Sequence, residues 1–161
     1  TILRDMGAAM SPFNAFMFIQ GLETLALRMK EHTSNAEKVA DYLSNHDAVE
    51  RVIYPSKMEG YAKERADKYL TRGNGGLMGF EIKGGIEAGK KFINALEMVY
   101  HVANIGDARS LAIHPGSTTH SQLNEEELLA AGITPGFVRL SIGLEHIDDI
   151  IADYEQALSK V

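Results

Sequence analysis

The chain has 161 residues, 45% of them hydrophobic and 24% charged, which is enough for one well-buried core and is typical of a folded, soluble domain. Its 22 acidic and 16 basic residues give a formal net charge of −6 at pH 7, which argues against a nucleic-acid partner because phosphate binding depends on clustered Lys and Arg. The absence of cysteine excludes disulfides, thiolate metal ligands and a cysteine nucleophile.

The first quarter of the chain is predicted to be helical. Ser11-Pro12 is typical of a helix start, with Ser11 as N-cap and proline at the first helical position. Apolar residues then recur at intervals of three and four, at Leu22, Leu25, Met29, Ala36, Val39 and Leu43. This spacing predicts a long helix that ends near His46 and turns one apolar stripe toward a core. Gly21 costs a helix about 1 kcal/mol relative to alanine, so we expect a break or close packing there.

Short strands and helices alternate through the middle of the chain. The predicted elements are a strand over 49–54, a helix over 61–70, a turn at 73–76, a strand over 77–83, a helix over 86–96, and short strands over 101–105 and 110–114. Alternation in the run 77–83 places Met78, Phe80 and Ile82 on one face. The glycines at 73–76 suggest a phosphate loop, but they lack its lysine pattern and precede a strand, so a turn is the preferred interpretation.

Two more helices are predicted near the end of the chain. Asn124 is placed to cap a helix whose first turn, Glu125-Glu126-Glu127, is acidic, as the helix dipole favours. Apolar residues at helical spacing over 147–161 predict the last helix. Helices that alternate with short strands indicate an α/β sandwich, in which helices cover one face of a small sheet.

The clearest strand, residues 137–143, carries the strongest candidate for a binding residue. Its period of two predicts two faces. The aliphatic face carries Val138, Leu140 and Ile142, and the mixed face carries Phe137, Arg139 and Ser141. A guanidinium matches a carboxylate with two parallel hydrogen bonds, and a strand limits the ways in which it can reorient. The alternative is that Arg139 pairs with an internal acid such as Glu145 or Asp107, and the residues alone favour neither interpretation.

Other polar groups allow weaker interpretations. His114 and His120 are the nearest candidates for metal ligands, but no third ligand is evident, so capping or surface roles are preferred and no metal is expected. Asn104 and Thr119 belong to the same stretch of chain as Arg139, and loop capping is the alternative role for both. No Gly-x-Ser-x-Gly elbow supports a serine nucleophile.

The ends and the hydropathy pattern suggest a location for the protein. No apolar run approaches the roughly 20 residues of a membrane-spanning helix, and residues 1–5 lack the basic and apolar regions of a signal peptide. We therefore expect a cytoplasmic protein without a membrane partner. Because the chain starts abruptly and without methionine, we also expect it to be a piece of a longer protein.

Several motifs together resemble the Cys/Met-metabolism family of pyridoxal-phosphate enzymes, and are most similar to its O-acetylhomoserine sulfhydrylase branch. The motifs are Leu3-Arg4-Asp5-Met6-Gly7-Ala8, Ser11-Pro12-Phe13-Asn14-Ala15-Phe16, Gln20-Gly21-Leu22-Glu23-Thr24-Leu25 with Arg28-Met29, Asn104-Ile105-Gly106-Asp107, His114-Pro115-Gly116-Ser117-Thr118-Thr119-His120, and Phe137-Val138-Arg139-Leu140-Ser141-Ile142-Gly143. The resemblance covers essentially the whole chain. It implies the small, mostly antiparallel sheet with helices on one face that forms the C-terminal domain of fold type I aminotransferase-like enzymes.

The resemblance also implies a site. The family holds the α-carboxylate of an amino-acid substrate with an arginine in an Arg-Leu-Ser strand, here Arg139, and with loop residues that match Asn104 and Thr119. Its pyridoxal phosphate is bound to a lysine in a Ser/Thr-rich loop of a preceding domain, and no lysine of this chain lies in such a loop. We therefore expect residues 1–161 to be one substrate-binding domain, with connecting helices over 1–46, that neither binds the cofactor nor turns over alone.

For the complete enzyme, the resemblance implies replacement of the acetate of O-acetylhomoserine by sulfide, in methionine and cysteine biosynthesis. It also implies partnership with an N-terminal cofactor domain and assembly into a homotetramer. Cystathionine-handling branches tend to have Ser-Leu-Gly-Gly where this chain has Asn104-Ile105-Gly106-Asp107, which favours the sulfhydrylase branch. The alternatives are a cystathionine synthase or lyase relative, and a non-catalytic module for carboxylate binding or oligomerisation.

Overall fold

The computed structural model describes residues 2–161, apart from the side chains of Leu3 and Glu125. Thr1, where the expected domain begins, and the Glu125 side chain of the predicted acidic turn lie outside the described part. The α-helices are α1 (Ile2–Met6), α2 (Pro12–Glu23), α3 (Leu25–Ser44), α4 (Gly60–Tyr69), α5 (Gly85–Ala95), α6 (Glu125–Ala130) and α7 (Ile147–Leu158). The strands are β1 (Val49–Ile53), β2 (Leu77–Ile82), β3 (Tyr100–His101), β4 (Leu111–Ile113) and β5 (Phe137–Ser141), and short 3-10 helices follow β1 (η1, Pro55–Lys57) and β4 (η2, Pro115–Ser117).

The strands form one five-stranded sheet in the order β1-β2-β5-β4-β3. Three neighbouring pairs are antiparallel, and only β3 and β4 run parallel. In the register of β2 against β5, Met78 lies opposite Leu140 and Phe80 opposite Val138. The sequence-based expectation of a small, mostly antiparallel sheet is therefore confirmed.

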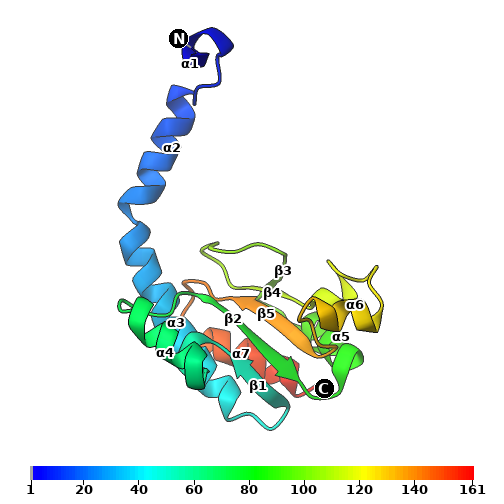
Figure 1. Ribbon diagram of the computed structural model, residues 1–161. Helices are drawn as coiled ribbons and strands as arrows, with labels where there is room; N and C mark the ends of the chain where they lie inside the picture. Colours follow the sequence, from blue (N-terminus) through cyan, green and yellow to red (C-terminus); the bar gives the residue numbers. More distant parts are fainter. Residues whose placement is uncertain (1) are drawn as a thin grey trace.

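Helices α3, α5 and α7 cover one face of this sheet (Figure 1). The predicted aliphatic face of β5 points into this core, where Val138 and Leu140 are fully buried. Phe80 of β2 meets Phe92 of α5 edge to face, with ring centroids 5.4 Å apart. A sheet with one apolar face must bury that face against another layer. The alternation of apolar and polar residues along the strands therefore predicted that helices cover one face.

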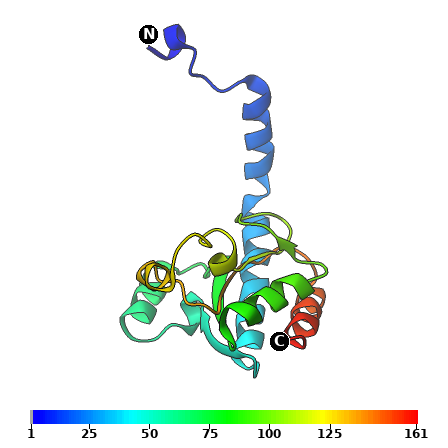
Figure 2. The ribbon, with the colours of Figure 1, turned by 90° about the vertical axis from the view of Figure 1, so that its right-hand side faces the viewer.

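The N-terminal helices project from the domain as an arm (Figures 1 and 2). The start predicted at Pro12 is confirmed, and Ser11 Oγ accepts a hydrogen bond from the Asn14 N–H at 3.2 Å. The helix is interrupted at Thr24, three residues beyond Gly21. Gly21 has open space around it, so of the two expected outcomes, a break or close packing, the structure shows a break, three residues later than expected.

The apolar stripe of the long helix was predicted to face a core along its whole length, and this is only half correct. Ala36 and Val39 are fully buried, whereas Leu22 is 63% exposed and Leu25 38% exposed. No residue of α2 is buried. The reason is that only the C-terminal half of α3 lies over the sheet, a fact of tertiary structure that helical spacing cannot reveal.

The strand predicted over 101–105 is also largely wrong. Only Tyr100 and His101 pair with β4, and the chain then leaves the sheet as an exposed loop, residues 102–109, that turns at Gly106 with a φ of 75°. Because its partner strand β4 is only three residues long, β3 can form backbone hydrogen bonds over only a short stretch. The strand predicted over 110–114 is confirmed as β4, and the predicted Asn124 cap is confirmed as a capping box with Glu127.

Within residues 2–161, no helix is both long and apolar enough to cross a lipid bilayer.

Candidate functional site

Arg139 projects from the face of β5 opposite the helices. The strand lies between β2 and β4, and Arg139 is in register with Gly79 on one side and Ile113 on the other. The side chain is half-buried, and its Nη2 donates to the backbone carbonyl of Asn104 at 3.3 Å. The ring of Phe137 lies over Gly79, and the middle of the sheet presents the Arg139 cation on the face opposite the helices.

The alternative that Arg139 pairs with an internal acid is not what the structure shows. Glu145 accepts hydrogen bonds from the Ser110 N–H at 2.7 Å and the Ser110 hydroxyl at 2.9 Å. Asp107 accepts from the Arg109 N–H at 3.0 Å within its own loop. Among the side chains that the structure describes, no carboxylate forms an ion pair with Arg139.

The loop 102–109 lies against the same face of β5 and is held there by hydrogen bonds. Besides the bond from Arg139 to Asn104, the Gly106 N–H donates to the Ser141 hydroxyl at 3.2 Å. The Leu144 N–H donates to the Ala108 carbonyl at 2.8 Å. Arg139 and Ser141 are two residues apart on one strand and therefore point the same way. The loop is thus exposed but tethered at three points.

The other two predicted site residues differ in position. Asn104 reaches Arg139 through its backbone carbonyl, whereas its side-chain Oδ1 accepts from the Ile105 N–H at 2.9 Å. Thr119 is exposed, and its hydroxyl lies 2.9 Å from His120 Nδ1. In the described part of the chain no hydrogen bond links Thr119 to Asn104 or Arg139. The structure therefore brings two of the three together, and the side-chain roles of Asn104 and Thr119 stay predictions.

A cavity of about 350 Å³ lies beside this loop. Its lining residues are Met29, His32, Gly76, Leu77, Ile105, Gly106, Ser141 and Ile142. His32 Nδ1 lies 2.6 Å from the Ile142 carbonyl, and because a carbonyl only accepts, this nitrogen carries the hydrogen. Sequence reasoning did not name His32 or Ser141 as site residues. The available signal for His32 was a polar residue within an apolar helical stripe, three positions after Met29.

His114 anchors the segment that carries Thr119. The ring is fully buried, its Nε2 lies 2.8 Å from the Pro135 carbonyl, and its Nδ1 lies 2.8 Å from the Ser117 hydroxyl. Nε2 therefore donates to Pro135 and Nδ1 accepts from Ser117. Burial lowers the pKa of His114 below its ordinary value, and Lys90 and His101 lower it further against the effect of the Pro135 bond. This neutral ring ties η2 to the turn that leads into β5.

The polar residues of the site do not include an amine that could hold pyridoxal phosphate. No lysine lines the cavity beside the loop 102–109. Lys57, Lys63 and Lys90 are paired with acids elsewhere on the surface. The described residues also contain no group of three histidine, cysteine, aspartate or glutamate side chains that could hold a metal ion. The residues that line this cavity therefore offer no amine for the cofactor's covalent attachment.

Comparisons with known proteins agree on one family. The profile of the family described as "Cys/Met metabolism PLP-dependent enzyme" matches residues 1–159. The chain is 56% identical over 160 residues to the O-acetyl-L-homoserine sulfhydrylase of Leptospira meyeri, covering 99% of this chain and 36% of that protein. It is 44% identical over 160 residues to an L-methionine gamma-lyase of Fusobacterium nucleatum subsp. polymorphum, covering 99% of the chain and 40% of that protein.

A solved structure shows the same fold. The crystal structure of a Campylobacter jejuni protein described as an O-acetylhomoserine (thiol)-lyase, which contains N'-pyridoxyl-lysine-5'-monophosphate, superposes with a TM-score of 0.87 and 47% sequence identity. The match covers 99% of this chain and 38% of that one. The chain thus spans about two fifths or less of the length of these relatives.

Proposed function

Because the chain belongs to the Cys/Met metabolism family of pyridoxal-phosphate-dependent enzymes, we propose that it is the part of an O-acetylhomoserine sulfhydrylase that holds the substrate α-carboxylate. The observation that carries the proposal is the position of Arg139. Its guanidinium projects from the uncovered face of a central strand, and its hydrogen bond in the described structure goes to a neutral carbonyl at 3.3 Å. A substrate carboxylate offers a stronger, charge-assisted partner.

Arg139 would act by binding and orientation. A guanidinium has five N–H donors in a fixed fork, and one of them is used by Asn104, so enough remain for a bidentate pair with a carboxylate. Holding the carboxylate at one end of the amino acid fixes the direction of its Cα–H bond relative to the rest of the site. Asn104, in the loop 102–109, would also bind the carboxylate. Thr119 would bind it as well, once its hydroxyl has turned away from His120.

Cofactor chemistry is assigned to residues outside this chain. When bound, pyridoxal phosphate supplies an electron sink for reactions of amino acids. Since the lining of the cavity offers no lysine, the proposal places the cofactor in a separate N-terminal domain of the complete enzyme. The complete enzyme would replace the acetate of O-acetylhomoserine with sulfide and would assemble as a homo-oligomer, with this chain alone inactive.

Substitution of Arg139 in the full-length protein tests the proposal. We expect Arg139→Lys to lower kcat/KM for O-acetylhomoserine about thirtyfold, equal to about 2 kcal/mol, because a bidentate charged pair becomes a single contact. Arg51→Lys, at an exposed arginine of the edge strand β1 that pairs with Glu81 and does not line the cavity beside the loop 102–109, is the matched control and should leave kcat/KM unchanged. Equal kinetics for Arg139→Lys and the parent enzyme would remove Arg139 from the site.

The methionine gamma-lyase relative supports a second candidate, elimination in place of replacement. Both reactions require the α-carboxylate to be bound, so substitution of Arg139 does not distinguish them. The two reactions are distinguished by assaying one preparation with O-acetylhomoserine plus sulfide and with methionine alone. A higher kcat/KM for methionine would replace the sulfhydrylase proposal with the lyase.

A further inference from the structure

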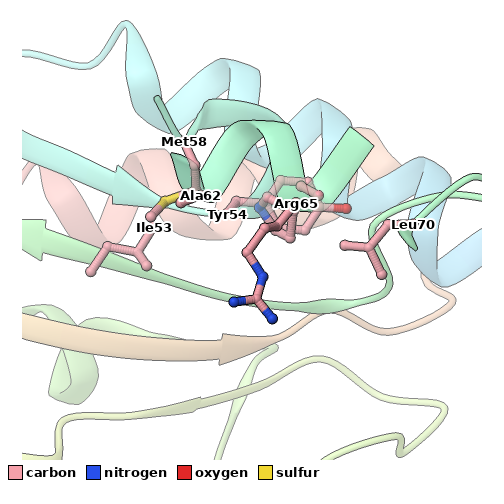
Figure 3. A pocket seen from close by; sticks show the side chains of 8 residues that line it. Ile53, Tyr54, Met58, Ala62, Arg65 and Leu70 are labelled. Carbon is pink, nitrogen blue, oxygen red and sulfur yellow. The ribbon is translucent and has the colours of Figure 1, made fainter. Parts of the chain in front are cut away.

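A second cavity, of about 390 Å³, lies between α4 and the segment formed by β1 and η1 (Figure 3). Its lining residues are Ile53, Tyr54, Pro55, Met58, Ala62, Arg65, Ala66 and Leu70. None of them lines the cavity beside the loop 102–109, so this crevice is separate from the candidate substrate site. Arg65 is the only charged member of the lining.

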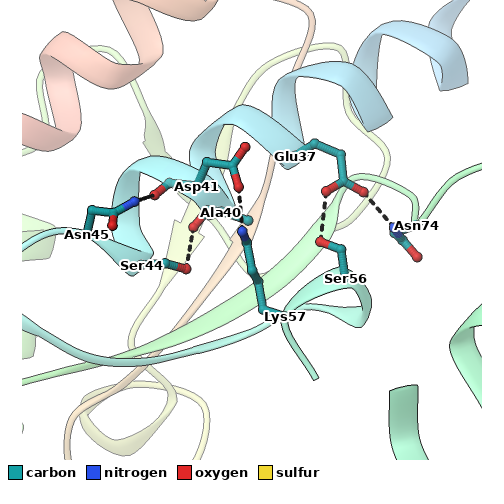
Figure 4. A network of polar contacts seen from close by, with 8 residues as sticks. All are labelled: Glu37, Ala40, Asp41, Ser44, Asn45, Ser56, Lys57 and Asn74. Atoms are coloured by element: carbon teal, nitrogen blue, oxygen red, sulfur yellow. Dashed lines mark hydrogen bonds and ion pairs between the residues drawn. The ribbon is translucent and has the colours of Figure 1, made fainter. Parts of the chain in front are cut away.

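The floor of the crevice is held rigidly to α3. Glu37 of α3 accepts hydrogen bonds from the Ser56 hydroxyl at 2.8 Å and from Asn74 Nδ2 at 2.5 Å, and Lys57 pairs with Asp41 (Figure 4). Tyr54 is 1% exposed, and its hydroxyl donates to the Gly75 carbonyl at 2.8 Å. These contacts tie Tyr54 to the turn at Gly75, and Ser56 and Lys57 of η1 to α3.

The opposite wall is α4, which lies on the surface of the domain. No residue of this helix is buried. Ala62 and Ala66 turn small side chains toward the floor, and this leaves the space that larger residues would fill. A rigid floor beneath a helix with small inward side chains is a preformed apolar slot.

Arg65 gives the slot a charged end. Its Nη1 donates to the Tyr61 hydroxyl at 3.1 Å, and its guanidinium lies 5.3 Å from the centre of the Tyr61 ring. Across residues 2–161, no described carboxylate forms an ion pair with Arg65. Figure 3 shows the side chain extending away from the labelled apolar residues. Arg65 thus contacts the exposed Tyr61 side chain and keeps further N–H donors for an anion.

We propose that this crevice binds a small organic monocarboxylate, with its apolar body between α4 and the β1–η1 floor and its carboxylate paired with Arg65. Arg65 is the one cation of the lining and balances a single negative charge, so a monocarboxylate leaves no further charge unpaired, as a phosphate dianion or a polyanion would. The volume and the apolar lining suit an aliphatic body of about six to eight carbons. A free amino acid fits less well, because the lining supplies no acid for its ammonium group.

Sodium octanoate is the probe for this proposal. The methyl resonance of Met58, assigned with Met58→Leu, is followed by NMR during a titration of the protein. We expect a saturable shift with a Kd in the low millimolar range, roughly 1–5 mM. Because Arg65 is exposed, Arg65→Gln should raise this Kd by only about fivefold. Lys68→Gln makes the same charge change on the same helix outside the lining, and should raise it less than about twofold.

Two further measurements locate the ligand. Ala62→Trp fills the slot from the exposed helix and should abolish the Met58 shift, and octan-1-ol should bind about fivefold more weakly than octanoate. Equal affinity for the alcohol and the acid, or equal effects of Arg65→Gln and Lys68→Gln, would overturn the carboxylate assignment. A Met58 shift that persists in Ala62→Trp, or no saturation by about 20 mM octanoate, would overturn the site itself.

Discussion

On the helix-covered face of β5, Val138 and Leu140 are fully buried, whereas Arg139 between them is half-buried on the opposite face and donates a hydrogen bond to the loop 102–109. The covered face is closed by aromatic and aliphatic contacts, such as that of Phe80 with Phe92. The uncovered face is joined by polar bonds to residues 102–109. Successive side chains of this one strand therefore point to opposite layers, with core residues on one side and the proposed binding residue on the other.

Removing a covered side chain is the change with the largest expected effect. Leu140→Ala should lower the free energy of unfolding by about 3 kcal/mol, because it leaves a cavity in a closed core. Arg139→Ala, one position away, should lower it by less than about 1 kcal/mol. Urea denaturation of both variants measures the difference. Equal losses would show that the uncovered face contributes as much to stability as the core does.

Asp153 of α7 is a buried polar residue on the helix-covered side of the sheet, and its substitution tests how much its hydrogen bonds contribute to stability. Its carboxylate is buried and accepts hydrogen bonds from the N–H groups of Glu97, Met98 and Val99 at 2.9–3.0 Å. Asp153→Ala would leave three donors unpaired, and should cost about 2 kcal/mol in urea denaturation. Asp153→Asn retains one acceptor oxygen and should cost less.

The pH dependence of Asp153 has a definite sign. Burial alone would raise the pKa of this carboxyl, but the three N–H groups and the Gln156 amide outweigh it and hold the pKa below its ordinary value. The unfolded chain therefore binds the proton first, and stability contributed by Asp153 is lost as pH falls below about 4. The melting temperature of Asp153→Asn should fall less steeply than that of the parent protein over this range.

A methyl group on the uncovered face should have a smaller effect. A Cβ at Gly79 would lie 2.4 Å from Cε2 of Phe137, so this half-buried ring, and not the backbone, would have to shift. Gly79→Ala should therefore cost about 1 kcal/mol by thermal denaturation. Combining it with Phe137→Leu should recover part of the loss. A cost equal to that of Leu140→Ala would mean that this face is packed as tightly as the core.

The smallest expected effect is the titration of His114. Because burial lowers its pKa in the folded protein, the unfolded chain takes up a proton first as pH falls below about 6.5, and stability declines there. We expect a decline in Tm of roughly 2 °C between pH 7 and pH 5.5 that is absent from His114→Asn. Identical dependence of Tm on pH in the two proteins would show that folding does not lower the pKa of His114.

Much of the fold and part of the site were accessible before any coordinates. The period of two in residues 137–143 gave the correct inward face and placed Arg139 opposite it. Asn124 and Glu127 are three residues apart, so their capping box is a local pattern. The motifs around Arg139 were also sufficient to indicate the family that the comparisons confirm.

What the sequence by itself determined are features whose causes lie within a few residues: alternation, caps, helical spacing and motif. Only the tertiary structure decided that Leu22 is exposed while Val39 is buried, and that β3 ends at His101. The tertiary structure also decided that His32 bonds to the Ile142 carbonyl. It decided as well that Arg139 bonds to the backbone carbonyl of Asn104 and not to its side-chain amide. These outcomes depend on partners 35 or 110 positions away, whose approach is set by how the layers pack and not by local conformational preference.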